Sequence, residues 1–269
     1  MKVKINDTEV DFRTEGERFT GENKVLLHQH DDLTAHTQWA GQGYKVADFL
    51  PEVHYHEFQA GMTAHIRQIL KACDLTDDEA FPLEKYHHLI QQYPQHLSVV
   101  DRAKLIQSHD FPVDIHLIEQ RVSEICQAEV HNLNPYTKER VFHFRIIRPQ
   151  SNDNNPLHRD VWLEEYHDGI NIYVPICGSN EFSSLTLVPG SHHWTEDQIE
   201  RTAKGAKVNG IQYNVPALLD ARQEMQVIRP NPKVNEILVF SPYLLHGGAV
   251  NLNQDTTRIS LEMRFSRKK

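Results

Sequence analysis

The chain has few of the features that mark several large classes of protein. Only three cysteines occur in 269 residues, and Cys73, Cys126 and Cys177 are far apart, with no C-x-x-C spacing. An odd and scattered set of cysteines argues against a disulfide framework and against a thiolate zinc site. It fits a protein that works in a reducing compartment.

Long apolar runs and an excess of positive charge are also missing. The N-terminal segment MKVKINDTEVDF lacks the apolar core of a secretion signal, and no run approaches the roughly 18 apolar residues of a membrane helix. The net charge of −9 argues against a nucleic-acid backbone or an anionic membrane as the main partner. We therefore expect a cytoplasmic protein, without an integral membrane segment, that acts on a small molecule. Nothing in the sequence indicates its oligomeric state.

The first half of the chain has the apolar spacing of helices. There is no internal repeat or low-complexity linker, so residues 1–269 are expected to form a single domain. The segment 1–12 predicts a hairpin that turns at Asn6-Asp7. Apolar residues that recur every three to four positions predict helices over 53–75, 83–93, 99–107 and 113–130. The histidines of this half are interpreted as surface or core-edge residues: His54, His56, His65, His87, His88, His96, His109 and His116.

From about residue 140 the apolar period changes to two. Strands are predicted over 141–150, 169–178, 183–191, 225–231, 236–242 and 257–266, separated by Gly, Pro, Asn and Asp. Helices followed by strands predict an α+β fold. In it, the helices of 1–139 pack on one face of a largely antiparallel sheet formed by 140–266.

The predicted strands have one apolar and one polar face. Phe142, Phe144 and Ile146 share one face, and His143 and Arg145 share the other. The same alternation recurs in 170–174, 184–187 and 258–265. For a single strand this is typical of a sheet with one face in water. Four such strands after a helical block instead favour a polar face that lines an internal pocket, where a buried Arg258 would need an anion.

The stretch QSNDNNPLHRDVW (150–162) holds the first candidate metal ligands. In an extended backbone, the side chains of His158 and Asp160 point the same way, roughly 6–7 Å apart. With a second histidine they would form the two-His, one-carboxylate face that binds non-haem Fe(II). With 18 histidines, a His-x-Asp pair is expected about once by chance. A second instance, His30-Asp31-Asp32, is interpreted as a polar loop.

Three further parts follow in order. LVPGSH (187–192) ends a strand in a Pro-Gly turn, HGG (246–248) follows a buried-type strand, and RIS (258–260) begins another. The glycines after His246 allow the backbone to approach whatever that residue binds. Each part has a structural alternative: Asp160 could cap a helix, and Arg258 could be an exposed strand residue. The conjunction of the parts in this order favours a functional site.

In this order and spacing, the parts resemble the phytanoyl-CoA dioxygenase-like branch of the Fe(II)/2-oxoglutarate oxygenases over residues 140–266. The resemblance implies a double-stranded β-helix, a jelly-roll or cupin-like core, with supporting helices on the major sheet. It implies Fe(II), 2-oxoglutarate and O2 as cofactors and cosubstrates. By the same resemblance His158, Asp160 and His246 are catalytic iron ligands, and Arg258 with Ser260 binds the distal carboxylate of 2-oxoglutarate. Related halogenases have a small residue in place of the carboxylate, so the retained Asp160 favours hydroxylation.

The chemistry of these residue types agrees with the resemblance. Three protein ligands leave three of six octahedral positions for the 2-oxo acid and O2. A guanidinium suits the remaining carboxylate because it is always charged and can bind it with two hydrogen bonds. Further candidates for cosubstrate contact are Arg145, Thr186 and Tyr173. Candidates for substrate contact are Arg148, Asn171, Trp162 and Arg264.

The sequence therefore predicts a dioxygenase that hydroxylates an unactivated C–H bond and decarboxylates 2-oxoglutarate to succinate. The polar pocket wall favours a small polar substrate, such as a sugar acid, an amino acid derivative or a biosynthetic intermediate. Two alternatives stay open. One is a metabolite-binding or sensor protein without activity on the same jelly roll, and the other is a cupin-type metalloenzyme that does not use 2-oxoglutarate.

Overall fold

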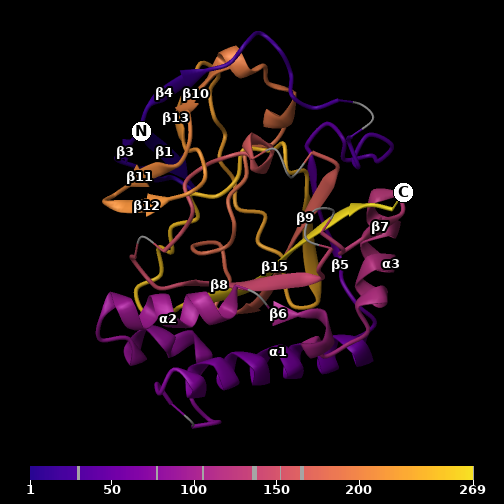
Figure 1. Cartoon of the computed structure of the whole chain (residues 1–269), viewed down its shortest axis with the longest axis vertical. Coiled ribbons are helices and arrows are strands. Elements are labelled where there is room, and N and C mark those ends of the chain that lie inside the picture. The colour runs from indigo at the N-terminus through magenta and orange to yellow at the C-terminus, as the bar shows by residue number, and fades with distance from the viewer. Residues whose placement is uncertain are drawn as a thin grey trace.

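The computed structural model describes residues 1–28, 31–76, 78–104, 106–134, 138–151, 153–163 and 167–268. The helices α1 and α2 lie at one end of the molecule, against a large sheet, and the small sheets of β1–β4 and β10–β13 lie at the opposite end (Figure 1). His30 falls outside the described residues, so its expected place in a polar loop stays a prediction. Among the described residues, no helix is both long enough and apolar enough to cross a bilayer.

Within the described residues, the large sheet has seven strands, and every pairing in it is antiparallel. Along the sheet lie β5 (Tyr44–Asp48), β14 (Glu236–Phe240), β9 (Gly169–Cys177), β15 (Arg258–Arg267), β8 (Val141–Ile147) and β6 (Ile106–Gln107), while β7 (Val130–His131) also pairs with β15. The expected division at residue 140 does not hold for the sheet, because β5, β6 and β7 come from the first half of the chain. Apolar content alone does not locate such short strands.

Facing the large sheet is a second, irregular layer. Single bridges join Leu187 to Ile228, Leu187 to His246, and His158 to His246. The predicted strands 183–191 and 225–231 are therefore wrong as regular strands. Pro189 and Pro230 explain the interruption, because proline has no N–H to donate to a ladder. The two layers together form the expected double-stranded β-helix, with Tyr173, Leu238 and Phe240 of one layer packed on Leu185, Leu187 and Leu244 of the other.

Three small sheets complete the strands. The hairpin of β1 (Lys2–Ile5) and β2 (Thr8–Asp11) turns at Asn6-Asp7, as predicted, with both turn residues at positive φ. The second sheet contains β13 (Leu218–Ala221), β10 (Ile199–Thr202) and β4 (Arg18–Thr20). The third contains β12 (Ile211–Tyr213), β11 (Ala206–Val208) and β3 (Thr14–Glu15). In both, an N-terminal strand joins strands from beyond residue 198.

The helices differ from the predicted ones mainly at their ends. Helix α1 (Glu52–Ala72) agrees with the prediction, and α3 (Ile115–Cys126) begins where the Asp114 side chain accepts a hydrogen bond from the N–H of His116. Helix α2 (Tyr93–Ala103) begins earlier than expected, because Gln92 and Gln95 form a capping box at its start. The segment predicted as a helix over 83–93 is a 3-10 helix, Leu83–Leu89. Short 3-10 helices also occur at Ser108–Asp110, Asp160–Trp162, Ser191–His193 and Glu196–Gln198.

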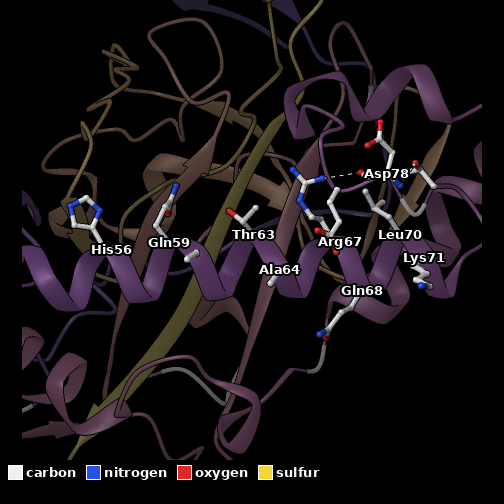
Figure 2. Close-up of a pocket in the computed structure, with 12 residues that line it drawn as sticks. His56, Gln59, Thr63, Ala64, Arg67, Gln68, Leu70, Lys71 and Asp78 are labelled. Carbon is white, nitrogen blue, oxygen red and sulfur yellow. Dashed lines mark hydrogen bonds between the residues drawn. The ribbon is translucent and has the colours of Figure 1, made fainter.

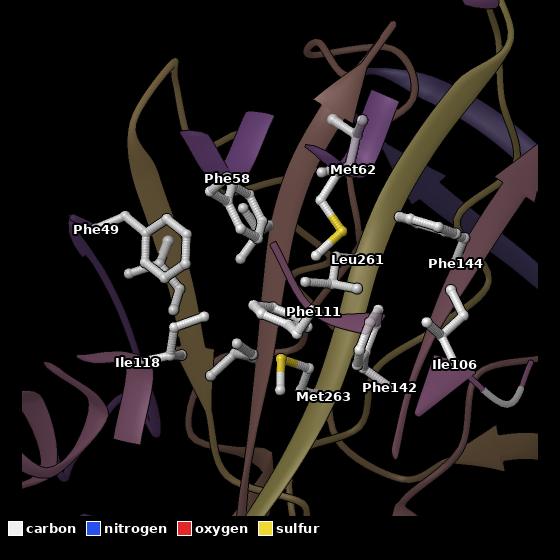
Figure 3. Packing of buried hydrophobic residues seen from close by; sticks show 14 of the residues in the cluster. Phe49, Phe58, Met62, Ile106, Phe111, Ile118, Phe142, Phe144, Leu261 and Met263 are labelled. Carbon is white, nitrogen blue, oxygen red and sulfur yellow. The ribbon is translucent and has the colours of Figure 1, made fainter. Parts of the chain in front are cut away.

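The main core lies between the helices and the apolar face of the large sheet (Figure 3). Helix α1 buries Phe58, Met62 and Ile66, which are spaced at three to four residues and so lie on one side of the helix. They meet the strand residues whose alternation predicted this face: Phe142, Phe144, Ile146, Ile170, Ile172, Val174, Ile259, Leu261, Met263 and Phe265. The helices therefore cover one face of the sheet, and the polar side chains of the same strands turn inward.

We expect Leu261→Ala to lower the free energy of unfolding by about 2–5 kcal/mol, because it removes buried methyl groups and leaves a cavity. Urea denaturation monitored by circular dichroism measures this change. Val53→Ala on α1 is the matched control, since Val53 is 68% exposed and should change stability by less than about 0.5 kcal/mol. Equal losses in the two variants would contradict this account of the core.

Candidate active site

His158, Asp160 and His246 come together where the irregular layer faces the large sheet. The backbone N–H of His158 donates to the carbonyl of His246, and the N–H of His246 donates back, both at 2.9 Å. Asp160 begins a 3-10 helix, and its N–H donates to the Pro242 carbonyl at 3.0 Å. Backbone pairing therefore holds together two segments that are far apart in the sequence.

The side chains of this triad are arranged to share one metal ion. The Nε2 atoms of His158 and His246 lie 3.3 and 3.7 Å from Oδ1 of Asp160. Each Nδ1 faces a backbone carbonyl, of Pro156 at 2.8 Å and of Leu244 at 2.9 Å. Because a carbonyl can only accept, each Nδ1 carries the proton, and each Nε2 lone pair is left for a metal. All three residues are buried.

Gly247 makes this approach possible. A Cβ atom at this position would lie 2.4 Å from the Pro156 oxygen and 3.1 Å from Nδ1 of His158. The residue also has a φ of +95°, which favours glycine. Any side chain here would push the two histidine segments apart.

Asp160 and His246 have the charge states of metal ligands. Burial raises the pKa of Asp160, but the positive charge of Arg264 and the two imidazoles outweigh it and hold this pKa well below its usual range. Asn171 also donates to Oδ2 of Asp160 at 2.8 Å. Burial, together with the neighbouring His158, lowers the pKa of His246 to about 4. At neutral pH the site therefore offers a carboxylate and a neutral His246 imidazole.

Arg258 and Ser260 are buried donors on the same face of β15. Arg258 is 2% exposed and Ser260 is fully buried, yet within the described chain Nε and Nη1 of Arg258 and Oγ of Ser260 have no hydrogen-bond partner. The guanidinium lies over the ring of Tyr173, 5.5 Å from its centroid. An unpaired buried charge is costly, so these donors fit a carboxylate supplied by a ligand.

One pocket connects the two groups. Its lining includes His158, His246, Arg258, Arg145 and Arg264. The Nε of Arg145 donates to Glu262 at 2.9 Å, and the Nε of Arg264 lies 3.3 Å from Oδ2 of Asp160. The pocket measures about 40 Å³, against roughly 300–1,000 Å³ for ordinary ligand sites. Binding of an organic ligand therefore requires the side chains that line it to move.

The remaining candidates of the sequence have other partners. The Thr186 hydroxyl donates to the Gly247 carbonyl, and the Tyr173 hydroxyl pairs with Ser179 at 2.7 Å. Arg148 binds both oxygens of Asp153 at 2.8 Å. Trp162 donates to Glu196 at 3.1 Å. None of these four candidates lines the pocket, although the ring of Tyr173 stacks against the guanidinium of Arg258.

A much larger groove, of about 790 Å³, lies elsewhere. It runs along the outer surface of α1 beside the loop that holds Asp78 (Figure 2). Apart from Asp78, its labelled side chains come from α1, and none of them belongs to a group of possible metal ligands among the described residues. The candidate active site is therefore assigned from its metal-ligand side chains and not from the volume of its cavity.

Sequence reasoning missed several residues of the site. Glu262 lies between Arg145 and His143, and burial raises its pKa, but Arg145 and His143 outweigh this and lower it. The alternation of β15 could have found Glu262, since it shares a face with Arg258. Asn154 and Asn155 also line the pocket, but their loop has no periodicity.

Arg159, between the two ligands of the HRD motif, is another missed residue. It is fully buried and points away from the triad, where Nη1 contacts Oε1 of Glu196 at 2.5 Å and Nη2 contacts the Ser191 carbonyl. Burial lowers the pKa of Arg159 to about 10, which still leaves it charged at neutral pH. Glu196 also accepts from Trp162. This buried ion pair fixes the backbone that carries His158 and Asp160.

Comparison with known proteins gives a family match. A family model described as phytanoyl-CoA dioxygenase (PhyH) matches residues 41–260. No curated protein matches the sequence.

Several solved structures are similar in fold. The crystal structure of EvdMO1 has a TM-score of 0.51 at 16% identity, and the alignment covers 85% of this chain and 48% of that one. SnoK, a non-heme alpha ketoglutarate dependent carbocyclase from nogalamycin biosynthesis, has a TM-score of 0.49 at 12% identity, covering 92% and 87%. EctD from S. alaskensis with 2-oxoglutarate and 5-hydroxyectoine has a TM-score of 0.45 at 12% identity, covering 94% and 83%. At these identities, the likeness to EvdMO1 shows the fold alone.

We expect Glu196→Ala to lower the free energy of unfolding by about 3–5 kcal/mol, because it leaves the Arg159 charge buried and unpaired. Thermal or urea denaturation measures the loss. Glu200→Ala is the matched control: Glu200 binds Arg18 at 3.0 Å on the surface, where such a pair contributes about 0–1 kcal/mol. A Glu196→Ala protein as stable as the control variant would show that the pair does not hold this segment.

Proposed function

The chain belongs to the phytanoyl-CoA dioxygenase family and is an Fe(II)- and 2-oxoglutarate-dependent oxygenase, and we propose that it hydroxylates an unactivated C–H bond of a small polar substrate. Its cofactors are Fe(II) and 2-oxoglutarate, with O2 as the oxidant. The observation that carries the proposal is the buried Arg258, unpaired at Nε and Nη1, in the pocket that both histidines of the metal-ligand triad line.

In this proposal, His158, Asp160 and His246 hold the iron. Their donor atoms lie within 4.8 Å of one another, and the hydrogen bonds at both Nδ1 atoms fix the imidazole tautomers. Asn171 and Arg264 orient the Asp160 carboxylate from the side of the large sheet. When bound, the iron with its cosubstrate supplies the oxidative chemistry, and the protein positions the substrate and excludes water.

Arg258 and Ser260 bind the distal carboxylate of 2-oxoglutarate in the same proposal. Both lie on β15, two residues apart, so their side chains share one face. A guanidinium and a hydroxyl together offer several donors to one carboxylate. The Tyr173 ring stabilises the guanidinium by a cation–π contact.

The pocket wall suggests the substrate class. Arg145, Glu262, Arg264, Asn154 and Asn155 all line the pocket, and three of them are charged. Polar groups of a substrate could replace the ion pair between Arg145 and Glu262. We therefore propose a sugar acid, an amino acid derivative or a similar polar intermediate, bound within a single oxygenase domain of residues 1–269.

We expect His158→Ala and His246→Ala each to abolish Fe(II)-dependent release of succinate, because each removes one of three metal ligands. The measurement is succinate formed from 2-oxoglutarate in the presence of Fe(II), O2 and candidate substrates. His109→Ala is the control, since the His109 side chain is 77% exposed and lies outside the pocket. Normal turnover in His158→Ala would rule out the proposed iron site.

We expect Arg258→Gln to raise the KM for 2-oxoglutarate by roughly 10–150-fold. This corresponds to about 1.5–3 kcal/mol for a hydrogen bond to a charged group. Metal affinity of the folded variant should stay unchanged, which equilibrium titration with Co2+ measures. Arg13→Gln, at an exposed position, serves as the control. An unchanged KM would show that Arg258 does not bind the cosubstrate.

A further inference from the structure

A second group of metal-ligand side chains lies outside the pocket. Nε2 of His87 and Nε2 of His88 each lie 2.8 Å from Oδ1 of Asp255. Among the described residues, this trio and the triad are the two groups of three whose donor atoms all lie within 4.8 Å of one another. The two histidines belong to the 3-10 helix Leu83–Leu89, and Asp255 belongs to the loop before β15.

His87 has the surroundings of a metal ligand. Its side chain is only 15% exposed, and its Nδ1 lies 2.9 Å from Oγ1 of Thr257. If Nδ1 donates its proton to this oxygen, the Nε2 lone pair faces Asp255 and is open to a metal. The same arrangement, with a fixed Nδ1 and a free Nε2, occurs at both histidines of the triad. His88 and Asp255 are more than half exposed, so an ion could reach the site directly from solvent.

We propose that His87, His88 and Asp255 form a second site, which binds a borderline divalent ion such as Zn2+. Two imidazoles and one carboxylate are typical zinc ligands, and water would complete the coordination. The site differs from the triad because it lies at the surface, away from the pocket lining. It also revises the interpretation of His87 and His88 as ordinary surface residues.

Lys85 sets the strength of this site. Its ammonium contacts Oδ2 of Asp255 and the Asp255 backbone carbonyl. It therefore neutralises part of the carboxylate charge and repels a cation bound at Oδ1. The ion and Lys85 can share the carboxylate, one at each oxygen, but the affinity is lower than for an unshared carboxylate.

The proposed ion joins two parts of the chain that already meet through the hydrogen bond between His87 and Thr257. These two residues are 170 positions apart in the sequence. It ties the 3-10 helix to the loop that enters β15, and Thr257 is followed directly by Arg258. The ion would stabilise this end of the sheet without taking part in oxidation. Its effect should appear as a higher melting temperature.

Zinc titration by calorimetry tests the proposal independently of the enzyme function. Wild-type protein should bind two Zn2+ per chain. His158→Ala/His246→Ala should bind one, and its melting temperature should still rise with Zn2+. Adding His87→Ala and His88→Ala to that double variant should abolish binding. His54→Ala, which alters a surface histidine paired with Glu57, should leave the stoichiometry unchanged.

A further variant, Lys85→Met, should strengthen zinc binding rather than abolish it. In the His158→Ala/His246→Ala background it should lower the Kd for Zn2+ by roughly tenfold, because a like charge leaves the neighbourhood of the ion. Circular dichroism of each variant checks that it is folded. The proposal is overturned if the His158→Ala/His246→Ala protein binds no Zn2+, or if binding survives His87→Ala/His88→Ala. Either result leaves the proposed function untouched, because the triad is absent from these variants.

Discussion

The reciprocal backbone hydrogen bonds between His158 and His246 are the contact on which the site depends. They join the segment after β8 to the segment after β14, and they bring the two imidazoles to a centroid distance of 4.4 Å. Gly247 permits this approach because it has no Cβ. The main-chain pairing and the hydrogen bond at each Nδ1 hold the two imidazoles side by side. Such preorganisation lowers the cost of binding an ion.

The large sheet determines what surrounds that contact. On β8 and β15, the apolar side chains face the helices and the polar side chains face the interior, so the core and the pocket are two faces of the same strands. On β15, Leu261 and Met263 belong to the core, while Arg258, Glu262 and Arg264 belong to the pocket. Stability and chemistry are therefore separated by side-chain direction, not by position along the chain. A one-residue shift in the register of β15 would exchange the two sets.

Much of this arrangement could be predicted from the sequence because it is periodic or locally encoded. The alternation in 141–147 and 258–267 identified the buried faces, and the order of HRD, HGG and RIS identified the residues that the structure brings to one place. The irregular layer was wrongly predicted as strands, because 183–191 has the alternation of a strand but is joined to its neighbours only by single bridges at Leu187. Helix α2 was placed too late because its start is set by side-chain capping at Gln92 and Gln95 rather than by apolar spacing.

The ion-pair partners could not be predicted either, because they depend on contacts between distant segments. Arg159 and Glu196 are 37 residues apart, and nothing in either local sequence indicates that they meet. Arg145 and Arg148 looked alike in the sequence. One faces Glu262 in the pocket, and the other is held by Asp153 outside the pocket lining. The residue type limits the contacts that a side chain can make, but the fold determines which charged side chains lie next to each other.

The buried arginines show why the unpaired one matters. Arg159 is compensated by the Glu196 carboxylate, and Arg229 donates to the carbonyls of Ser184 and Val250. Arg258 is also buried, and two of its donors, Nε and Nη1, have no partner in the described chain, against Nε alone in Arg159 and in Arg229. A fold that compensates two buried guanidiniums with its own groups has the means to compensate a third. Leaving Arg258 without an anion from the protein costs stability, and in the proposed function the distal carboxylate of 2-oxoglutarate offsets that cost when it binds.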